Sequence, residues 1–268
     1  MKNIVLYCKS YRNDLQRIKI LIDSVKKYNV DNIEFYISTP STDLDLFKNS
    51  FGSDYVKFIS DDDIYPNVNH LRGWESQQII KSSFWKLNLC QNYLMIDSDS
   101  YFIKPFGISD FMYDTNTPFT VMHEQKDLFS WSSKNHTVLG FNPRESFVND
   151  RLLIMDVFDR SGKIFDFGPS PVIWSSKVWK SLEDTYLKPN DITFQDLINK
   201  MPSEFSWYGE WLLYSKCISI MPIEPIFKCF HYLQQYNEYK NRGYTLDHWK
   251  ENYIGVVMQS SSNLPLQY

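Results

Sequence analysis

Residues 93–106 read YLMIDSDSYFIKPF, and this stretch decides how the rest of the chain is interpreted. Its four apolar residues, 93–96, run directly into Asp97-Ser98-Asp99, and a short apolar run predicts a buried strand. Alternate residues of an extended segment share a face, so Asp97 and Asp99 are expected to point the same way. Two such carboxylates repel each other unless a proton or a cation lies between them. A hard divalent cation that also holds substrate phosphates fits this arrangement, and a solvated acidic turn is the alternative.

The residues before this stretch alternate between strand and helix patterns. The predicted strands are 3–7, 33–38 and 56–59, and the predicted helices are about 14–25, 42–48 and 75–91. This alternation predicts an α/β fold with a mainly parallel sheet and right-handed crossovers. Ligands bind beyond the carboxyl ends of the strands in such sheets, which is where Asp97 and Asp99 are expected.

The second half of the sequence has a less regular pattern. The predicted strands are 118–122, 172–174, 218–221 and 226–230, and the predicted helices are 143–160, 176–186, 192–199 and a stretch from 206. Residues 123–141 are polar and aromatic and are predicted to form a long loop, and the tail from Ser260 is expected to fray. We predict a single domain over 1–268, with a donor-binding half, 1–106, and an acceptor-binding half, 107–268.

Length and composition limit the class of protein. The chain has 268 residues, of which 43% are hydrophobic and 22% charged, which is typical of a globular domain with a sizeable core. The net charge of −4 argues against a general nucleic-acid binder. The four cysteines have no metal-ligand spacing and are expected to be reduced. With no secretory signal and no apolar run of membrane-spanning length, we expect a cytoplasmic protein, and peripheral contact with the inner face of a membrane stays open.

The order of elements and three segments resemble the GT-A glycosyltransferases. The segments are VLYCKSY at 5–11, the acidic end of the third predicted strand and MIDSDSYF at 95–102. The resemblance is strongest to a bacterial family of small GT-A-like proteins with this Asp-x-Asp motif and an uncharacterised activity, and it spans most of the chain. It implies a nucleotide-sugar donor, a divalent metal (Mn²⁺ or Mg²⁺) on its diphosphate, and a glycan or lipid-linked acceptor in surface polysaccharide synthesis.

The resemblance also implies roles for the motif residues. Asp97 would contact the donor ribose or the water shell of the metal, and Asp99 would bind the metal directly. His231, just past a predicted strand, is the expected further metal ligand, and His123 is a weaker candidate. A lone histidine is more often structural, so a structural His231 is the alternative.

Donor contacts are expected near the ends of the predicted strands. Lys9, Ser10 and Tyr11 lie at the mouth of the first strand, where this fold meets the base and ribose. The remaining expected donor contacts are Asp61 for the base, and Arg17, Arg72 and Lys81 for the diphosphate. Fixed cations stabilise a dianionic leaving group, but a solvated surface position is the alternative for each of these residues.

An inverting transfer, which we favour over a retaining one, needs a general base for the acceptor hydroxyl. We predict Glu210, because Tyr208 and Trp211 would desolvate its carboxylate and raise its pKa towards working pH. The alternative is a glutamate that stabilises a helix N-terminus. Asp166 and Glu204 are the reserve candidates. A retaining transfer needs no such base.

Three other functions share parts of this pattern. A phosphatase with an Asp-x-Asp nucleophile normally has a Thr two residues beyond the second Asp, where this chain has Tyr101. A nucleotidyltransferase needs a glycine-rich phosphate loop, and residues 8–14 contain no glycine. A non-catalytic glycan-binding protein on the same fold would need neither nucleotide nor metal.

Overall fold

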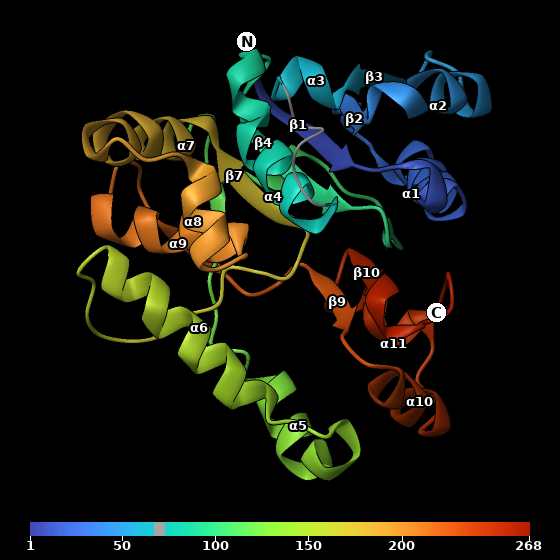
Figure 1. Cartoon of the computed structure of the whole chain (residues 1–268). Coiled ribbons are helices and arrows are strands. Elements are labelled where there is room, and N and C mark those ends of the chain that lie inside the picture. Colours follow the sequence, from blue (N-terminus) through green and yellow to red (C-terminus); the bar gives the residue numbers. More distant parts are fainter. Residues whose placement is uncertain (67–72) are drawn as a thin grey trace.

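The computed structural model describes residues 1–66 and 73–268, and its centre is a five-stranded sheet (Figure 1). The strand order is β3-β2-β1-β4-β7. The strands are β1 (Lys2–Lys9), β2 (Phe35–Thr39), β3 (Val56–Ser60), β4 (Cys90–Asp97) and β7 (Val172–Ser175). The first four are parallel, and β7 runs antiparallel to β4. The predicted α/β fold with a mainly parallel sheet is therefore confirmed, and its strands come from both predicted halves of the chain.

The helices that connect these strands follow the predicted pattern with two differences. They are α1 (Leu15–Tyr28), α2 (Leu44–Phe51), α3 (Asp61–Ile64) and α4 (Gly73–Ser83). The helix predicted over 75–91 ends at Ser83, and a 3₁₀ turn then runs to Leu87, where left-handed Asn88 turns the chain into β4. The acidic residues after β3 form the short helix α3, for which no helix is predicted, and the Ser60 side chain caps it.

A smaller sheet forms beside the first, from strands far apart in the chain (Figure 1). Its order is β5 (Ser100–Phe102), β10 (Gly255–Met258) and β9 (Phe227–Phe230). A two-stranded sheet joins β6 (Phe119–Val121) to β8 (Met221–Ile223). The prediction of a frayed tail is wrong, because the Tyr268 amide donates to the Tyr101 hydroxyl over 2.8 Å and its ring stacks on Phe230.

The predicted loop over 123–141 is also wrong, because it contains α5 (Lys126–Leu139). Helix α5 packs against α6 (Pro143–Val157) through Phe129 and Phe147, whose ring centroids are 5.1 Å apart. Both helices lie away from the central sheet (Figure 1). The start of α6 is as predicted, since Asn142 Oδ1 accepts from the next amides. The remaining helices are α7 (Ser176–Leu182), α8 (Phe194–Lys200), α9 (Glu204–Ser215), α10 (Leu233–Asn241) and α11 (Leu246–Lys250).

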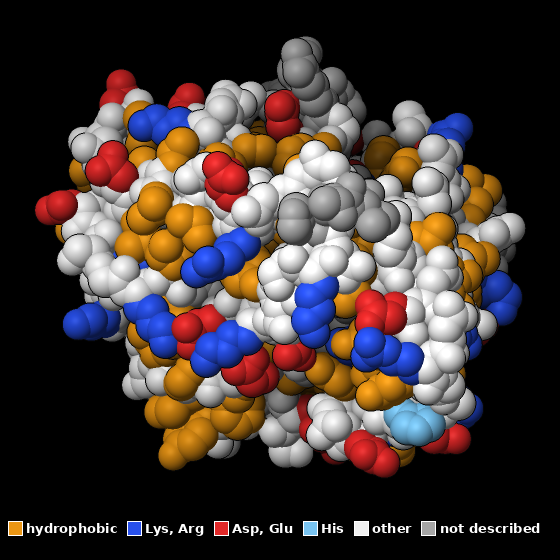
Figure 2. All heavy atoms as spheres, turned by 90° about the horizontal axis from the view of Figure 1, so that it is seen from below, with side chains coloured by type: hydrophobic (Ala, Val, Ile, Leu, Met, Phe, Trp, Pro, Cys, Tyr) orange, Lys and Arg blue, Asp and Glu red, His pale blue; other side chains and the backbone are white. Residues whose placement is uncertain are grey.

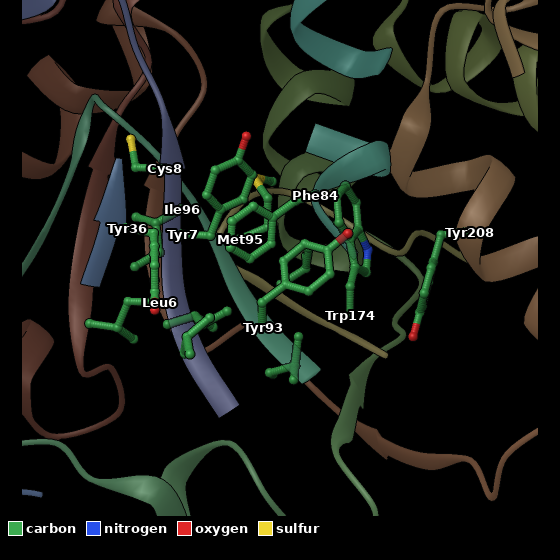
Figure 3. Packing of buried hydrophobic residues seen from close by; sticks show 14 of the residues in the cluster. Leu6, Tyr7, Cys8, Tyr36, Phe84, Tyr93, Met95, Ile96, Trp174 and Tyr208 are labelled. Atoms are coloured by element: carbon green, nitrogen blue, oxygen red, sulfur yellow. The ribbon is translucent and has the colours of Figure 1, made fainter. Parts of the chain in front are cut away.

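A row of buried aromatic rings crosses the central sheet towards α9 (Figure 3). Tyr7 stacks on Phe84 at 3.9 Å between centroids, Phe84 meets Tyr93 at 5.1 Å, and Tyr93 meets Trp174 at 5.8 Å. Trp174 lies 5.6 Å from Tyr208 of α9. Each such pair contributes about 0.5–1.5 kcal/mol beyond the burial of its area. The row therefore ties the second half of the chain to β1 and β4, directly below the ends of these strands.

The surface and the cysteines add little that is specific. On the face seen in Figure 2, basic and acidic side chains are interspersed. All four cysteines are free, as expected, and three of them are buried. Among the described residues, no helix combines the length and the apolar character that crossing a membrane requires.

Candidate functional site

Polar atoms without partners collect at the carboxyl edge of the parallel sheet. Ser10 follows β1, Asp61 follows β3, and Asp99 lies two residues past β4. Within 1–66 and 73–268, Ser10 Oγ, Asp61 Oδ1 and Asp99 Oδ1 are buried and have no hydrogen-bond partner. Such atoms are rare in native proteins, and each needs a reason. Because parallel strands end at the same edge, these atoms offer hydrogen bonds to one ligand region.

The Asp-x-Asp segment is a turn and not an extended run, so this part of the prediction is wrong. Strand β4 ends at Asp97, and Ser98 and Asp99 turn the chain into β5. Asp97 Oδ1 pairs with Lys81 Nζ at 2.5 Å, and Asp99 Oδ2 accepts from the Ser260 amide at 2.8 Å. The two carboxylates still interact, because burial and then the charge of Asp97 raise the pKa of Asp99 to about 6.

This raised pKa makes the stability of the metal-free protein depend on pH. The Asp99 carboxyl binds its proton more tightly in the folded state than in the unfolded chain, where the pKa is about 3.9. Its contribution to stability is therefore fully present below about pH 4 and lost as the pH rises through about 6, up to about 3 kcal/mol. Asp99→Asn removes this titration, so the melting temperature of the variant relative to wild type should rise between about pH 4 and pH 7. Parallel melting profiles of the two proteins in chelator would contradict this expectation.

Lys81 of α4 neutralises the acidic end of β4. Its buried ammonium contacts Asp97 and lies 3.4 Å from Glu204 Oε1. Burial alone would lower the pKa of Lys81, but these two carboxylates outweigh it and raise the pKa. Lys81, a predicted diphosphate contact, is therefore already paired with two carboxylates. One of them belongs to Glu204, a reserve candidate for the general base.

An ion pair links the last residue of β1 to the first residue after β3. Lys9 Nζ lies 2.9 Å from Asp61 Oδ2 and donates to the Ser10 carbonyl at 2.7 Å. Burial raises the pKa of Asp61, and the Lys9 ammonium opposes this rise. The structure therefore brings together Lys9, Ser10 and Asp61, three of the residues predicted to contact the donor. The fourth, Tyr11, follows Ser10 in the chain and is half-buried.

Arg17 and Arg72 are the other predicted phosphate contacts. Arg17 of α1 donates to the Met258 carbonyl at 3.3 Å, and its charge opposes the rise in the pKa of Asp99. Arg17 is thus beside the acidic turn. Arg72 lies outside the described residues.

The predicted metal ligands Asp99 and His231 lie at the same end of the smaller sheet, next to its two outer strands. The Asp99 carbonyl accepts from the Met258 amide at 2.9 Å, and Met258 pairs with Phe230, the residue before His231. Two strand spacings place their main chains roughly 10 Å apart. Desolvation lowers the pKa of His231 to about 4, so its imidazole is neutral, the form that binds metals. In the described ranges, no three His, Cys, Asp or Glu side chains are grouped to hold a metal ion.

A pocket of about 490 Å³ adjoins this end of the smaller sheet and is lined by His231, His123 and Pro169, among others. The segment 166–170 connects the pocket to the acidic turn. The Gly168 carbonyl lies 2.6 Å from His123 Nε2, and Ser170 Oγ accepts from the Asp97 amide at 2.8 Å. Because a carbonyl can only accept, His123 Nε2 is the donor to Gly168, and His123 Nδ1 lies 3.8 Å from Glu224 Oε2.

Asp166, a reserve base, is buried and fully bonded. It accepts from Arg151 at 2.8 Å, from the Phe167 amide at 2.9 Å and from Gln125. Burial alone would raise its pKa, but Arg151 and His123 outweigh this and lower the pKa to about 2. Asp166 thus stays ionised and holds the segment that orients His123.

The predicted base, Glu210, lies inside α9 with no exposed surface. Both of its oxygens are bonded by Arg160, one of them at 2.7 Å from Nη2. Burial raises the pKa of Glu210, and Arg160 opposes the rise. Its role as the base stays a prediction, and that role would require Arg160 to release the carboxylate. Its neighbour Gly209 has a packing role, because a Cβ there would lie 1.9 Å from Phe167.

Several residues at the site carry no local sequence signal. Ser170 and Ser260 bond the Asp-x-Asp turn from distant segments. Asp14 is predictable only as a helix cap, yet its carboxylate accepts from Ser98 Oγ at 2.8 Å and caps no amide. Only contacts between distant parts of the chain reveal these three.

The model of the family described as "Family of unknown function (DUF6492)" matches residues 3–238. The chain belongs to the DUF6492 family. A search of curated proteins finds no match.

Among solved structures, this DUF6492 protein is similar to mouse xyloside xylosyltransferase 1 in its apo form. The TM-score is 0.52 at 8% sequence identity, over 98% of this chain and 100% of that chain. At this identity the similarity shows the fold alone, which is that of a GT-A-like glycosyltransferase.

Proposed function

We propose that this protein transfers a sugar from a nucleotide-sugar donor to a glycan or lipid-linked acceptor. One observation carries the proposal: in the part of the chain that the structure describes, Ser10, Asp61 and Asp99 each have a buried polar atom without a hydrogen-bond partner at the carboxyl edge of the sheet. The fold is shared with a xylosyltransferase, and this edge is where open α/β sheets bind ligands. The wider setting, bacterial surface polysaccharide synthesis, rests on the family resemblance alone.

Asp97 and Asp99 would hold a divalent cation, Mn²⁺ or Mg²⁺. Asp99 Oδ1 is buried and has no hydrogen-bond partner among the described residues. The charge of Asp97 disfavours ionisation of Asp99, so a cation fits between the two carboxylates. Two carboxylates suffice for a metal that also binds substrate phosphates. The bound cation would supply positive charge to the diphosphate leaving group. Lys81 orients Asp97, the Ser260 amide orients Asp99, and His231 is the proposed further ligand.

The other donor contacts are proposed from position. Lys9, Ser10 and Asp61 would meet the nucleoside, and Arg17 would face the diphosphate. The acceptor would enter the pocket lined by His123 and His231. For an inverting transfer, His123 Nδ1 is a second candidate base beside Glu210.

Thermal stabilisation tests this proposal directly. UDP, GDP and CMP would each be added with and without Mn²⁺, and the melting temperature recorded. A ligand at about a hundred times its dissociation constant adds about 2.7 kcal/mol to stability. We expect a metal-dependent shift with one nucleotide, which also identifies the base.

Two outcomes would change the proposal. A shift that needs no metal would remove the cation from Asp97, Asp99 and His231 but keep the transferase. No shift with any nucleotide, together with binding of free glycans, would favour a non-catalytic glycan-binding protein. Hydrolysis of a phosphate ester dependent on Asp97 would favour the phosphatase.

A further inference from the structure

The pocket described above, here called the acceptor pocket, has the size of a small-molecule site. Its volume of about 490 Å³ lies within the range of about 300–1,000 Å³ that is usual for ligand pockets. Its wall includes Lys228 and Cys229 of β9 and Tyr253 before β10. Pro169 also lines it and adjoins Ser170, which bonds Asp97, so the pocket opens beside the proposed donor site.

Lys228 is an unusual residue for such a wall. It is only 6% exposed, and within the parts of the chain that the structure describes its ammonium has no hydrogen bond and no ion pair. Its neighbours are aromatic rings instead. The ammonium lies 4.8 Å from the ring centroid of Tyr239, 5.1 Å from Trp249, and 5.9 Å from Phe230 and from Tyr253.

Aromatic rings attract a cation but accept its N–H bonds poorly. A Lys ammonium has three donors, and a buried charge is costly unless it is paired and hydrogen-bonded. Burial accordingly lowers the pKa of Lys228, and the charge of Asp127, which also lines the pocket, opposes this fall. The two other acids that line the pocket lie beside other groups: Glu124 pairs with Lys126 and Lys163, and Glu224 lies 3.8 Å from His123 Nδ1. Among the residues that the structure describes, the ammonium of Lys228 is thus a buried cation in the pocket wall whose N–H donors have no acceptor.

We propose that the acceptor pocket binds a ligand with an anionic group, a carboxylate or a phosphate, on Lys228. This inference rests on the proposed function and names its acceptor class: an acidic sugar or a phosphate-bearing, for example lipid-linked, acceptor. The oxygens of a carboxylate or phosphate can accept the N–H bonds of the Lys228 ammonium, which aromatic rings accept poorly. Hydrogen bonds between charged groups are also stronger than neutral ones. The aromatic rings around Lys228 would hold the ammonium in place for the anion.

Direct binding to the full chain, in chelator and without nucleotide, tests the inference. Calorimetry would compare glucuronate, glucose 1-phosphate and glucose. We expect the two anions to bind more tightly than glucose, and Lys228→Met to weaken only the anions, by roughly tenfold or more. The better of the two anions distinguishes a carboxylate acceptor from a phosphate one.

Two variants serve as controls. Lys126→Met removes a lysine from the same pocket, but one that is exposed and paired with Glu124, so it should leave anion binding unchanged. Lys228→Arg keeps the charge and should retain the preference for anions, which separates charge loss from misfolding. Melting curves would confirm that each variant folds.

Equal binding of all three ligands, no binding of either anion to wild type, or an unchanged anion affinity in folded Lys228→Met would overturn the inference. The result of the nucleotide experiment does not depend on the result of this one. Nucleotide binding without anion binding would leave the transferase and remove the acidic acceptor. Anion binding at Lys228 without nucleotide binding would leave the pocket and remove the transferase.

Discussion

Asp99→Asn is expected to lower sugar transfer by on the order of 10²–10³-fold, while the protein stays folded. The change removes one of the two carboxylates proposed for the cation and leaves the side-chain shape intact. The asparagine oxygen can still accept from the Ser260 amide, whose bond to Asp99 is 2.8 Å long. At neutral pH the variant should also be more stable than wild type without metal, because the cost of ionising a buried carboxyl is removed.

Turnover with Mn²⁺ and the identified nucleotide sugar would measure this effect, beside a melting curve for each protein. Asp54→Asn makes the same chemical change at an exposed position and should behave as wild type. Opposite movements, with stability rising and activity falling, are the signature of a carboxylate kept for function. Wild-type turnover in Asp99→Asn would remove the metal role from this residue.

Glu210→Gln is expected to lower the free energy of unfolding by about 3–5 kcal/mol. The carboxylate is fully buried, and Arg160 bonds both of its oxygens. Removing one partner of a buried ion pair leaves the other charge without compensation. Urea denaturation of wild type and variant would give the difference directly.

The turnover of the folded variant then tests whether Glu210 is also the base. Loss of a general base costs roughly 10²–10⁴-fold, so a smaller loss, under about tenfold, would move that role to another residue such as His123. Arg160→Met is the matched control, because it breaks the same pair and keeps the carboxylate. Similar stability loss in both variants with activity retained would make the pair structural, and a stable Glu210→Gln would contradict the ion-pair argument.

Much of the first half of the fold is predictable because its signals are local. The apolar run before Asp97 and the strand–helix alternation from Ile4 onward follow from the burial of both faces of a parallel sheet. The carboxyl-edge position of Ser10, Asp61 and Asp97 follows from the same alternation, since parallel strands must end at one edge. The cap at Asn142 is likewise a local hydrogen bond.

The second half of the fold is less predictable from local patterns, because packing between distant segments determines it. Helix α5 carries a polar and aromatic sequence, and its aromatic contact with α6 stabilises what its own pattern does not predict. Strand β10 and the docked Tyr268 depend on partners more than a hundred residues away, Tyr101 among them. The turn at Ser98 and Asp99 likewise exists because β5 must pair with β10.

Local sequence patterns predict the parallel sheet, the acidic stretch at its carboxyl edge and the residue types available there. Which of those residues are already paired depends on the folded structure. The sequence predicts a functional role for both Lys81 and Glu210. In the folded protein, Lys81 neutralises Asp97, and Glu210 is bound by Arg160. Lys228 belongs to no sequence motif, yet it is buried among aromatic rings and has no hydrogen bond or ion pair within the described residues. The physical reason is that pairing and desolvation of a charge depend on side chains brought together by folding, which no local pattern encodes.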